Sequence, residues 1–357
     1  MAASIQPSEL IVVRELYLAE KIVMVDGQAG CGKTLISPLV ASFDRVELLT
    51  YAYELEHICW LHFLNKVTTD AAVAMSRMWT DLQLYNSMMA REVNFRLTDM
   101  SSVFQDVRPW RYLRRIFSEG DEAVPGRVKN ERPILHLTTH NLLGASDPVF
   151  EALGDRLVFI EVVRHPLYTL KQSSLNMERV MHDSRHFTIY YRRGSEAVPV
   201  WAYGWEQRFI DSNPMEKAIY VVDHLSRLTE SKKMALKQKY KARIVTIPFE
   251  RFVIEPDRYL QEVCVFLSTR VTTATRAVMK RQKVPRAKIA DGLGLKIYKR
   301  CGWVGPQKGA DELKEYELRW RHAAQSASRQ ALTVLDRLCT EYEQTYLGGC
   351  LPYQRPL

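Results

Sequence analysis

The sequence of 357 residues predicts an α/β fold in which helices cover both faces of a central parallel β-sheet. Three observations carry this prediction. Short runs such as residues 22–25 and 156–163 are almost wholly apolar, as are strands that a sheet buries on both faces. These runs alternate with helix-length segments, which is the order of βαβ units. The first run also passes through a glycine-rich turn directly into a helix-forming segment.

The expected strands are apolar runs of strand length that end at polar or turn-forming residues. In chain order they are residues 22–25, 133–140, 156–163, 218–222 and 243–249. The fourth run, "AIYVV", would place Asp223 at the tip of a strand. Because the carboxyl ends of parallel strands meet at one edge of a sheet, residues at these tips are candidates for a shared site.

The expected helices are recognised by their caps and first turns. Thr68, Thr69 or Asp70 can cap a long pattern, Asp147 opens another helix, and Pro166 occupies the first turn of a third. In chain order the helices are residues 34–43, 70–95, 147–154, the segment from 166 to 180, 228–240, 256–267 and one long C-terminal helix at 310–346. Residues 97–130 mix Gly, Pro, Asp and Arg, which indicates a loop-rich insertion.

Length and composition fit one domain over residues 1–357, with an insertion at about 65–130 and a basic tail plus C-terminal helix at about 268–357. The chain has no apolar run of 18 residues and no basic-then-apolar N-terminal segment, so neither a membrane span nor a secretory signal is predicted. Six cysteines are scattered without a C-x-x-C pair, which favours reduced thiols over a zinc site or a disulfide framework. A cytoplasmic protein is expected.

The net charge of +9 is concentrated in one stretch of the chain. Between Arg270 and Arg300 there are ten Lys or Arg residues and a single acid, Asp291. Such a surplus indicates either a polyanionic ligand, such as a nucleotide, a phosphorylated or sulfated substrate or a nucleic acid, or a solvated basic loop.

The turn after the first strand, "DGQAGCGKTL", has the spacing Gly-x-x-x-x-Gly-Lys-Thr of a phosphate-binding loop. Gly27, Gly30 and Gly32 allow a tight turn with inward N–H groups, and the N-terminus of the following helix adds positive potential. Lys33 can reach a terminal anionic oxygen, and Thr34 can bind a phosphate or Mg²⁺. The motif therefore predicts nucleotide binding but does not specify the reaction.

An ATP-using enzyme with such a loop also needs an acid that orients Mg²⁺, commonly at the tip of a neighbouring strand. The strands "LTTH" and "EVVRH" carry His140 and Arg164 at their tips instead. Asp223 is the acid in a comparable position. A Mg-ATP-dependent small-molecule kinase that uses Lys33, Thr34 and Asp223 is therefore an alternative function.

The segment "ILHLTTHNLLGASDPVFEALGDRLVFIEVVRHPLYTLKQSSLN" (residues 134–176) resembles the sulfotransferase superfamily. Those P-loop-fold enzymes transfer a sulfuryl group from 3′-phosphoadenosine 5′-phosphosulfate (PAPS) to a hydroxyl or amine. In the family one strand ends in Lys-Thr-His, and a later strand ends in Arg-x-Pro before a helix with a Ser. Here His140 precedes Arg164 by 24 residues. The segment "IPFERFVIEPDRYLQEVCVFL" (247–267) is similar to a further element of the family.

The resemblance, which covers about residues 21–267, implies a three-layer P-loop fold and a set of roles. His140 would be the general base that takes the proton of the acceptor, and Lys33 would stabilise the oxygen that leaves with the nucleotide. Arg164, a Ser and part of the basic tail would hold the 3′-phosphate of PAPS. No metal is expected. The residues expected to bind PAPS are Gly27, Gly30, Cys31, Gly32, Lys33, Thr34, Arg164, Ser173 or Ser174, and Arg300.

The chain departs from the family's pattern at three positions. The family's loop, Lys-Ser-Gly-Thr-Thr, has a Lys two residues before its Gly, and this position is Gly30 when Gly32 is matched. The Lys before Thr-His is Thr138, and the usual Ser falls on Gln172. Three functions therefore stay open: sulfuryl transfer from PAPS to a small-molecule or glycan acceptor, phosphoryl transfer from Mg-ATP, and non-catalytic binding of a nucleotide or nucleic acid. The first is the predicted function.

Overall fold

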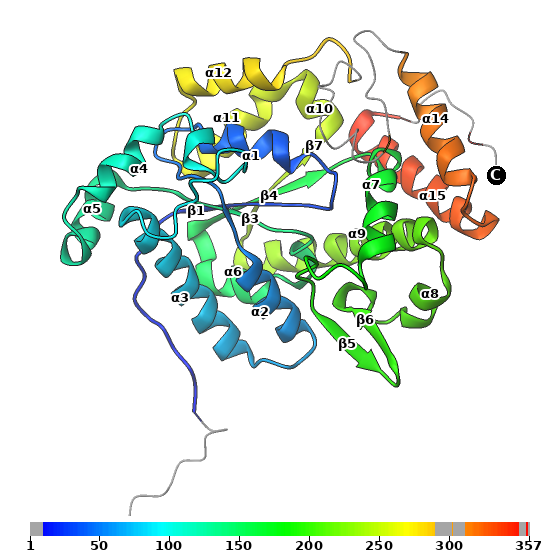
Figure 1. Ribbon diagram of the computed structural model, residues 1–357, viewed down its shortest axis with the longest axis horizontal. Helices are drawn as coiled ribbons and strands as arrows, with labels where there is room; N and C mark the ends of the chain where they lie inside the picture. Colours follow the sequence, from blue (N-terminus) through cyan, green and yellow to red (C-terminus); the bar gives the residue numbers. More distant parts are fainter. Residues whose placement is uncertain (1–9, 290–301, 303–310, 350–354, 356–357) are drawn as a thin grey trace, which may run out of the picture.

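The computed structural model describes residues 10–289, 302, 311–349 and 355, which form a sheet with helices on both sides (Figure 1). The described sheet has five strands, all parallel, in the order β2-β3-β1-β4-β7. The bounds are Thr50–Tyr51 for β2, Leu135–Thr138 for β3, Ile22–Asp26 for β1, Leu157–Val163 for β4 and Arg243–Pro248 for β7. The predicted α/β class with a central parallel sheet is confirmed.

The helices that cover the sheet come from along the whole chain. The first seven are α1 (Lys33–Ala41), α2 (Tyr53–Phe63), α3 (Thr69–Met88), α4 (Pro109–Ile116), α5 (Val124–Glu131), α6 (Asp147–Leu153) and α7 (Pro166–Arg179). They are followed by α8 (Glu206–Asp211), α9 (Pro214–Tyr240), α10 (Phe249–Ile254), α11 (Pro256–Leu267), α12 (Thr273–Gln282), α14 (Glu312–Ala324) and α15 (Arg329–Tyr342). A separate antiparallel hairpin joins β5 (Tyr190–Arg193) to β6 (Glu196–Pro199).

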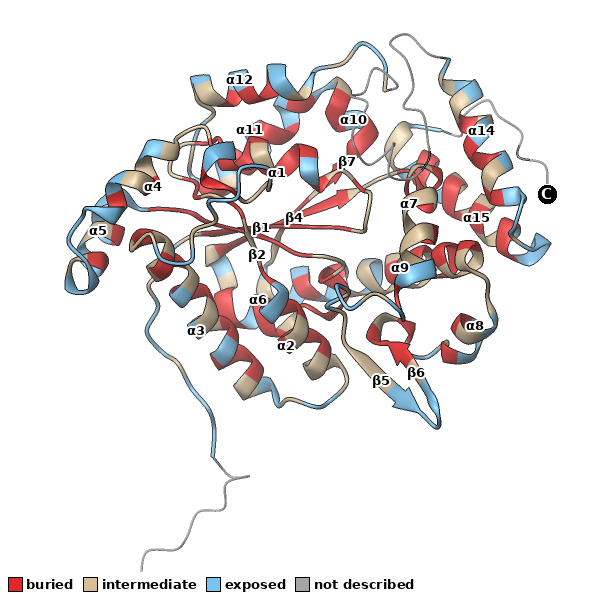
Figure 2. Cartoon of the chain, in the orientation of Figure 1, coloured by how far each residue is buried: buried red, intermediate tan, exposed pale blue. Residues whose placement is uncertain are grey.

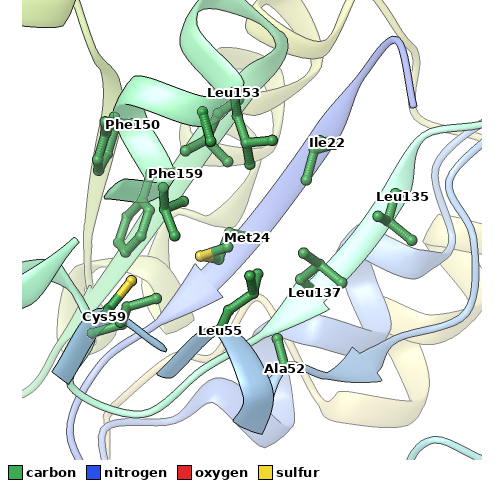
Figure 3. Close-up of a cluster of buried hydrophobic side chains, with 14 of the residues drawn as sticks. Ile22, Met24, Ala52, Leu55, Cys59, Leu135, Leu137, Phe150, Leu153 and Phe159 are labelled. Carbon is green, nitrogen blue, oxygen red and sulfur yellow. The ribbon is translucent and has the colours of Figure 1, made fainter. Parts of the chain in front are cut away.

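Alternate residues of the central strands belong to two different hydrophobic clusters. Ile22 and Met24 of β1 pack with residues of α2, α3, α6 and α9, as Figure 3 shows for part of this cluster. Val23 and Val25 of the same strand pack with residues of α1, α10, α11 and α12. Because both faces are covered, the strands and the inner faces of the helices are buried (Figure 2). This is why the strands are apolar at nearly every position.

Residues 218–222 are helical, so the predicted strand at "AIYVV" is wrong. They lie inside α9, a helix of 27 residues that begins with a capping box between Asn213 and Glu216. The buried residues Ala218, Ile219, Val222 and Leu225 follow the 3.6-residue period of one helix face. A short apolar run cannot by itself distinguish a strand from the buried face of a helix.

The C-terminal segment is not one helix over 310–346, as the sequence suggested. Two helices, α14 and α15, are separated at residues 325–328, where Ser328 caps α15 by accepting a hydrogen bond from the N–H of Ala331. The small polar residues of "QSAS" favour such a break, because their side chains compete for backbone hydrogen bonds. Sequence analysis also missed β2, α2 and the β5–β6 hairpin, and it extended α3 beyond its end at Met88.

Within the part of the chain that the structure describes, no helix combines the length and the apolar character that crossing a bilayer requires.

Candidate active site

The glycine-rich turn joins β1 to α1 at the carboxyl edge of the sheet. Gly27, Gly30 and Gly32 have φ angles of 144°, 82° and 111°, which side-chain-bearing residues rarely adopt. A Cβ at Gly27 would lie 2.3 Å from the carbonyl oxygen of Val162, and one at Gly32 would lie 2.2 Å from the ring of Phe249. The turn is therefore packed so closely that two of its glycines have no room for a side chain.

The side chain of Lys33, the first residue of α1, reaches back into this turn. Its Nζ donates hydrogen bonds to the carbonyl oxygens of Gly27 and Gln28, the latter across 3.2 Å, and it lies 4.0 Å from Sγ of Cys31. The side chain is buried, whereas Thr34 is exposed at the start of α1. The positive charge of Lys33 and the N-terminus of α1 thus lie close together at the turn. Both favour the binding of an anion.

Arg164 follows β4 and reaches the same turn. Its Nη1 donates a hydrogen bond of 2.8 Å to the carbonyl oxygen of Gly30. The guanidinium lies 4.3 Å above the centre of the Phe249 ring, and its Nε is 3.9 Å from Oε1 of Glu250. Two segments 134 residues apart are therefore in direct contact at the sheet edge.

Helix α7 also faces the turn, through a residue that sequence reasoning did not select. A Cβ at Gly30 would lie 3.0 Å from Oε1 of Gln172. Ser174 is buried and donates its hydroxyl hydrogen to the carbonyl oxygen of Lys171, while Ser173 is half-buried. The signal for Gln172 was its spacing, since it stands where the resembling family has its Ser.

The basic tail contributes Arg286 near the turn, and Arg281 lines a cavity together with Thr34. The guanidinium of Arg286 lies 5.8 Å from the centre of the Phe249 ring, whose edge packs on Gly32. Its position in the stretch 270–300 was the available signal. Arg300, the tail residue named from the sequence, lies outside the described residues, as does Asp291.

His140 lies two residues beyond β3, beside a carboxylate that the sequence did not reveal. Oε1 of Glu56, on α2, accepts a hydrogen bond of 3.0 Å from the backbone N–H of His140 and lies 3.1 Å from Nδ1 of the ring. The ring also stacks against Tyr51 and Tyr53, with centroid distances of 6.2 and 5.7 Å. Desolvation, and then the nearby charge of Lys33, lower the pKa of His140 to about 3.

Asp26 holds the segment that carries His140. Its carboxylate accepts hydrogen bonds from the hydroxyl of Thr139 and from the backbone N–H groups of Leu142 and Leu143, at 2.9 to 3.1 Å. The residue closes β1, directly before the glycine turn. The turn and the segment that carries His140 are therefore fixed to each other through a buried carboxylate.

Asp223, the acid named for a Mg-ATP site, is not at the sheet edge. It lies within α9 and forms ion pairs with Arg227 at 2.8 Å and with Arg337 of α15 at 2.5 Å. The predicted strand-tip position of this carboxylate is wrong because the strand before it does not exist. Nowhere in the described part of the chain do three or more His, Cys, Asp or Glu side chains converge as metal ligands.

Two cavities adjoin the glycine turn. One, of about 390 Å³, is lined by Gly27, Gln28, Cys31 and Arg164, with walls from α7, α9 and α15. The other, of about 500 Å³, begins at Thr34 and runs along α1 beside the insertion and the end of α12. His140 lines neither of these two cavities. Its ring instead lies beside Tyr51 of β2 and Tyr53 of α2. About a third of the His140 side chain is exposed.

No protein-family model and no curated protein sequence matches the chain. The solved structures that it resembles include sulfotransferases. The domain from the Synechococcus PCC 7002 olefin synthase is 12% identical, with a TM-score of 0.40 over 87% of this chain and 97% of that one. The domain from the curacin biosynthetic pathway is 12% identical, with a TM-score of 0.42 over 93% and 99%. A Mycobacterium avium sulfotransferase is 13% identical, with a TM-score of 0.40 over 92% and 77%. Likeness this remote assigns neither a family nor an activity.

Proposed function

We propose that the protein transfers a sulfuryl group from PAPS to a hydroxyl or amine of an acceptor. The observation that carries this proposal is the contact between Arg164 and the glycine turn. PAPS has two separate anionic ends, and the site offers two separate cationic groups, Lys33 within the turn and Arg164 at its outer side. A guanidinium suits a terminal phosphate because its N–H groups match two phosphate oxygens.

In the proposed reaction, the bond from sulfur to the bridging oxygen of PAPS breaks and a bond from sulfur to the acceptor oxygen or nitrogen forms. The bridging oxygen and its electron pair leave with adenosine 3′,5′-bisphosphate. Lys33 stabilises that developing charge. Nε2 of His140 takes the acceptor's proton. Since the transition state of such transfers is loose, positioning and charge stabilisation provide most of the acceleration.

The residues of the site fit the two ends of PAPS. Gly27 packs closely on Val162 and Gly32 on Phe249, which holds the turn in its tight conformation. The backbone N–H groups of such a turn can bind an anion. Gln172 faces Gly30, and the guanidinium groups of Arg164 and Arg286 both lie over the ring of Phe249. We assign these residues to the end of PAPS that carries the 3′-phosphate.

A two-substrate transferase needs room for donor and acceptor at one reacting centre. Two cavities beside the turn provide room for the donor, and the partly exposed ring of His140, which lines neither cavity, lies where the acceptor would enter. We propose a small molecule or one end of a glycan as the acceptor, and the larger cavity encloses about 500 Å³. Such a volume is within the range of small-molecule sites.

A Mg-ATP-dependent kinase is the second candidate, because the spacing Gly-Lys-Thr with an exposed Thr34 is the loop of ATP-binding proteins. Such a kinase would have to orient Mg²⁺ without Asp223, because the carboxylate of Asp223 forms ion pairs with Arg227 of α9 and Arg337 of α15.

Turnover distinguishes the two candidates. The protein is incubated with PAPS and pooled alcohols, amines and glycans, and in parallel with Mg-ATP and the same pools. We expect acceptor-dependent release of adenosine 3′,5′-bisphosphate in the first series and no ADP in the second. Lys33→Ala serves as the blank. Acceptor-dependent ADP formation without bisphosphate release would contradict the proposal.

A further inference from the structure

Glu56 is the nearest acidic partner of His140, although 84 residues separate them in the sequence. Oε1 of Glu56 accepts the backbone N–H of His140 at 3.0 Å, and the same oxygen lies 3.1 Å from Nδ1 of the ring. In this backbone contact the N–H group of His140 is the donor and Oε1 of Glu56 is the acceptor. The carboxylate is therefore fixed to the main chain of the residue whose side chain it also contacts.

The orientation of the ring is determined by two further contacts. The planes of Tyr51 and Tyr53 lie at 7° and 15° to the imidazole plane. These stacking contacts hold the plane of the ring, and Glu56 holds Nδ1 at one edge of it. Nε2 then lies at the opposite edge, and no described residue provides it with a hydrogen-bond partner. The open nitrogen is the one that can meet an acceptor molecule.

We propose that Glu56 is a positioning residue for His140, selecting the tautomer in which Nδ1 carries the proton and Nε2 is free to accept one. The proposal rests on the proposed function insofar as His140 is the base. Its chemistry is that of an oriented imidazole, in which a carboxylate holds the far nitrogen and stabilises the imidazolium that forms during transfer. Glu56 itself contacts no reacting atom in this account.

The charges around Glu56 make the pair sensitive to pH. Burial and the carboxylate of Asp26 on β1 raise the pKa of Glu56 to about 8, against the opposing effects of the His140 backbone N–H, Lys33 on α1 and the neighbouring His57. Above that pKa the ionised carboxylate accepts the Nδ1 proton. Below it, the carboxylic acid donates to Nδ1, and the proton of the neutral ring moves to Nε2. The base form therefore increases as pH rises through 8.

Imidazole ¹⁵N–¹H correlation NMR tests this directly. In the wild-type protein, we expect His140 Nε2 to change from protonated to unprotonated in one step centred near pH 8. Glu56→Gln should abolish the step, because the amide does not ionise. Glu54→Gln is the matched control, since Glu54 is an exposed acid on the same helix, and it should keep the step. A step that persists in Glu56→Gln would overturn the proposal.

Two further measurements keep the result interpretable. Glu56→Asp is measured in case the glutamine variant does not fold. Because aspartate is still ionisable, this variant should keep the change in His140 Nε2 protonation at a different pH. Absence of that change in Glu56→Asp would contradict the proposal. For PAPS turnover, Glu56→Gln should lower the rate by about tenfold or more without changing the affinity for adenosine 3′,5′-bisphosphate. Because the NMR experiment needs no substrate, absence of turnover in the wild type would contradict the proposed function and not the role of Glu56 in setting the tautomer.

Discussion

Arg164 donates a hydrogen bond from Nη1 to the carbonyl oxygen of Gly30 across 2.8 Å, although one residue directly follows β4 and the other lies in the turn after β1. Parallel pairing of β1 with β4 brings these ends together, with Asp26 opposite Glu161. The contact places a second cationic group beside the glycine turn that contains Lys33. This arrangement supports the proposed binding of a nucleotide with two anionic ends.

Replacing Arg164 with Ala should weaken binding of adenosine 3′,5′-bisphosphate. A hydrogen bond to a charged group contributes about 1.5–3 kcal/mol, which corresponds to a Kd about 10–100 times higher. Calorimetry measures this change. Arg276→Ala is the control, because its ion pair with Asp257 is more than half exposed, and it should leave the Kd unchanged. An Arg164→Ala protein with wild-type affinity would remove this residue from the site.

Gly32→Ala should destabilise the protein and abolish nucleotide binding. The new methyl group would lie 2.2 Å from the Phe249 ring, at a φ angle of 111°. Gly126 is the matched control, since a Cβ there meets nothing within 4 Å and the residue lies in α5. Gly126→Ala should raise the unfolding free energy by up to about 1 kcal/mol. Thermal unfolding measures both variants, and equal stability of the two would contradict the geometry of the turn.

His140→Ala should lower PAPS turnover by about 10²–10⁴ while the Kd for the bisphosphate stays within twofold or so. The reason is that the imidazole acts on the acceptor's proton and does not touch the phosphate groups. Calorimetry and bisphosphate release are measured on the same preparation. Comparable losses of affinity and turnover would mean that His140 supports the fold of the site and is not the base.

Glu47→Gln should destabilise the fold strongly. The carboxylate of Glu47 is buried and forms a bidentate pair with Arg115 of α4, at 2.8 and 3.0 Å. Breaking a buried pair costs about 3–5 kcal/mol, because a buried charge loses its partner. Here Arg111 loses its ion pair, and Arg115 keeps only the partly exposed Glu131. Asp257→Asn, at an exposed pair, should cost less than about 1 kcal/mol. Denaturant unfolding distinguishes the two, and a small effect at Glu47 would contradict the buried pair.

The same carboxylate predicts a dependence of stability on pH. Burial alone would raise the pKa of Glu47, but Arg111 and Arg115 outweigh burial and hold the pKa at about 2 in the folded protein. Since the folded pKa lies below the unfolded one, the contribution of Glu47 is present above pH 4.5 and is lost as pH falls toward 2. In Glu47→Gln, the loss of stability over this range should be smaller than in the wild type.

Local patterns in the sequence predicted the parts of the site that are continuous in the chain. The strands β1 and β4, the glycine turn and Arg164 follow from apolar runs and glycine spacing. Glu56 could not be predicted, because its relationship to His140 depends on where α2 lies against the sheet. Gln172 stands at an expected position with an unexpected side chain. The position of Asp223 was predicted wrongly because "AIYVV" has the apolar composition of a strand. The segment lies within the long helix α9, whose cap at Asn213 is several residues away.

The measurement that tests the central claim most directly is calorimetric titration of the wild-type protein with adenosine 3′,5′-bisphosphate and with ATP, each with and without Mg²⁺. We expect the bisphosphate to bind more tightly than ATP and with the same affinity in the presence and absence of Mg²⁺. Tight binding of Mg-ATP with no measurable binding of the bisphosphate would contradict a sulfuryl donor and favour a kinase.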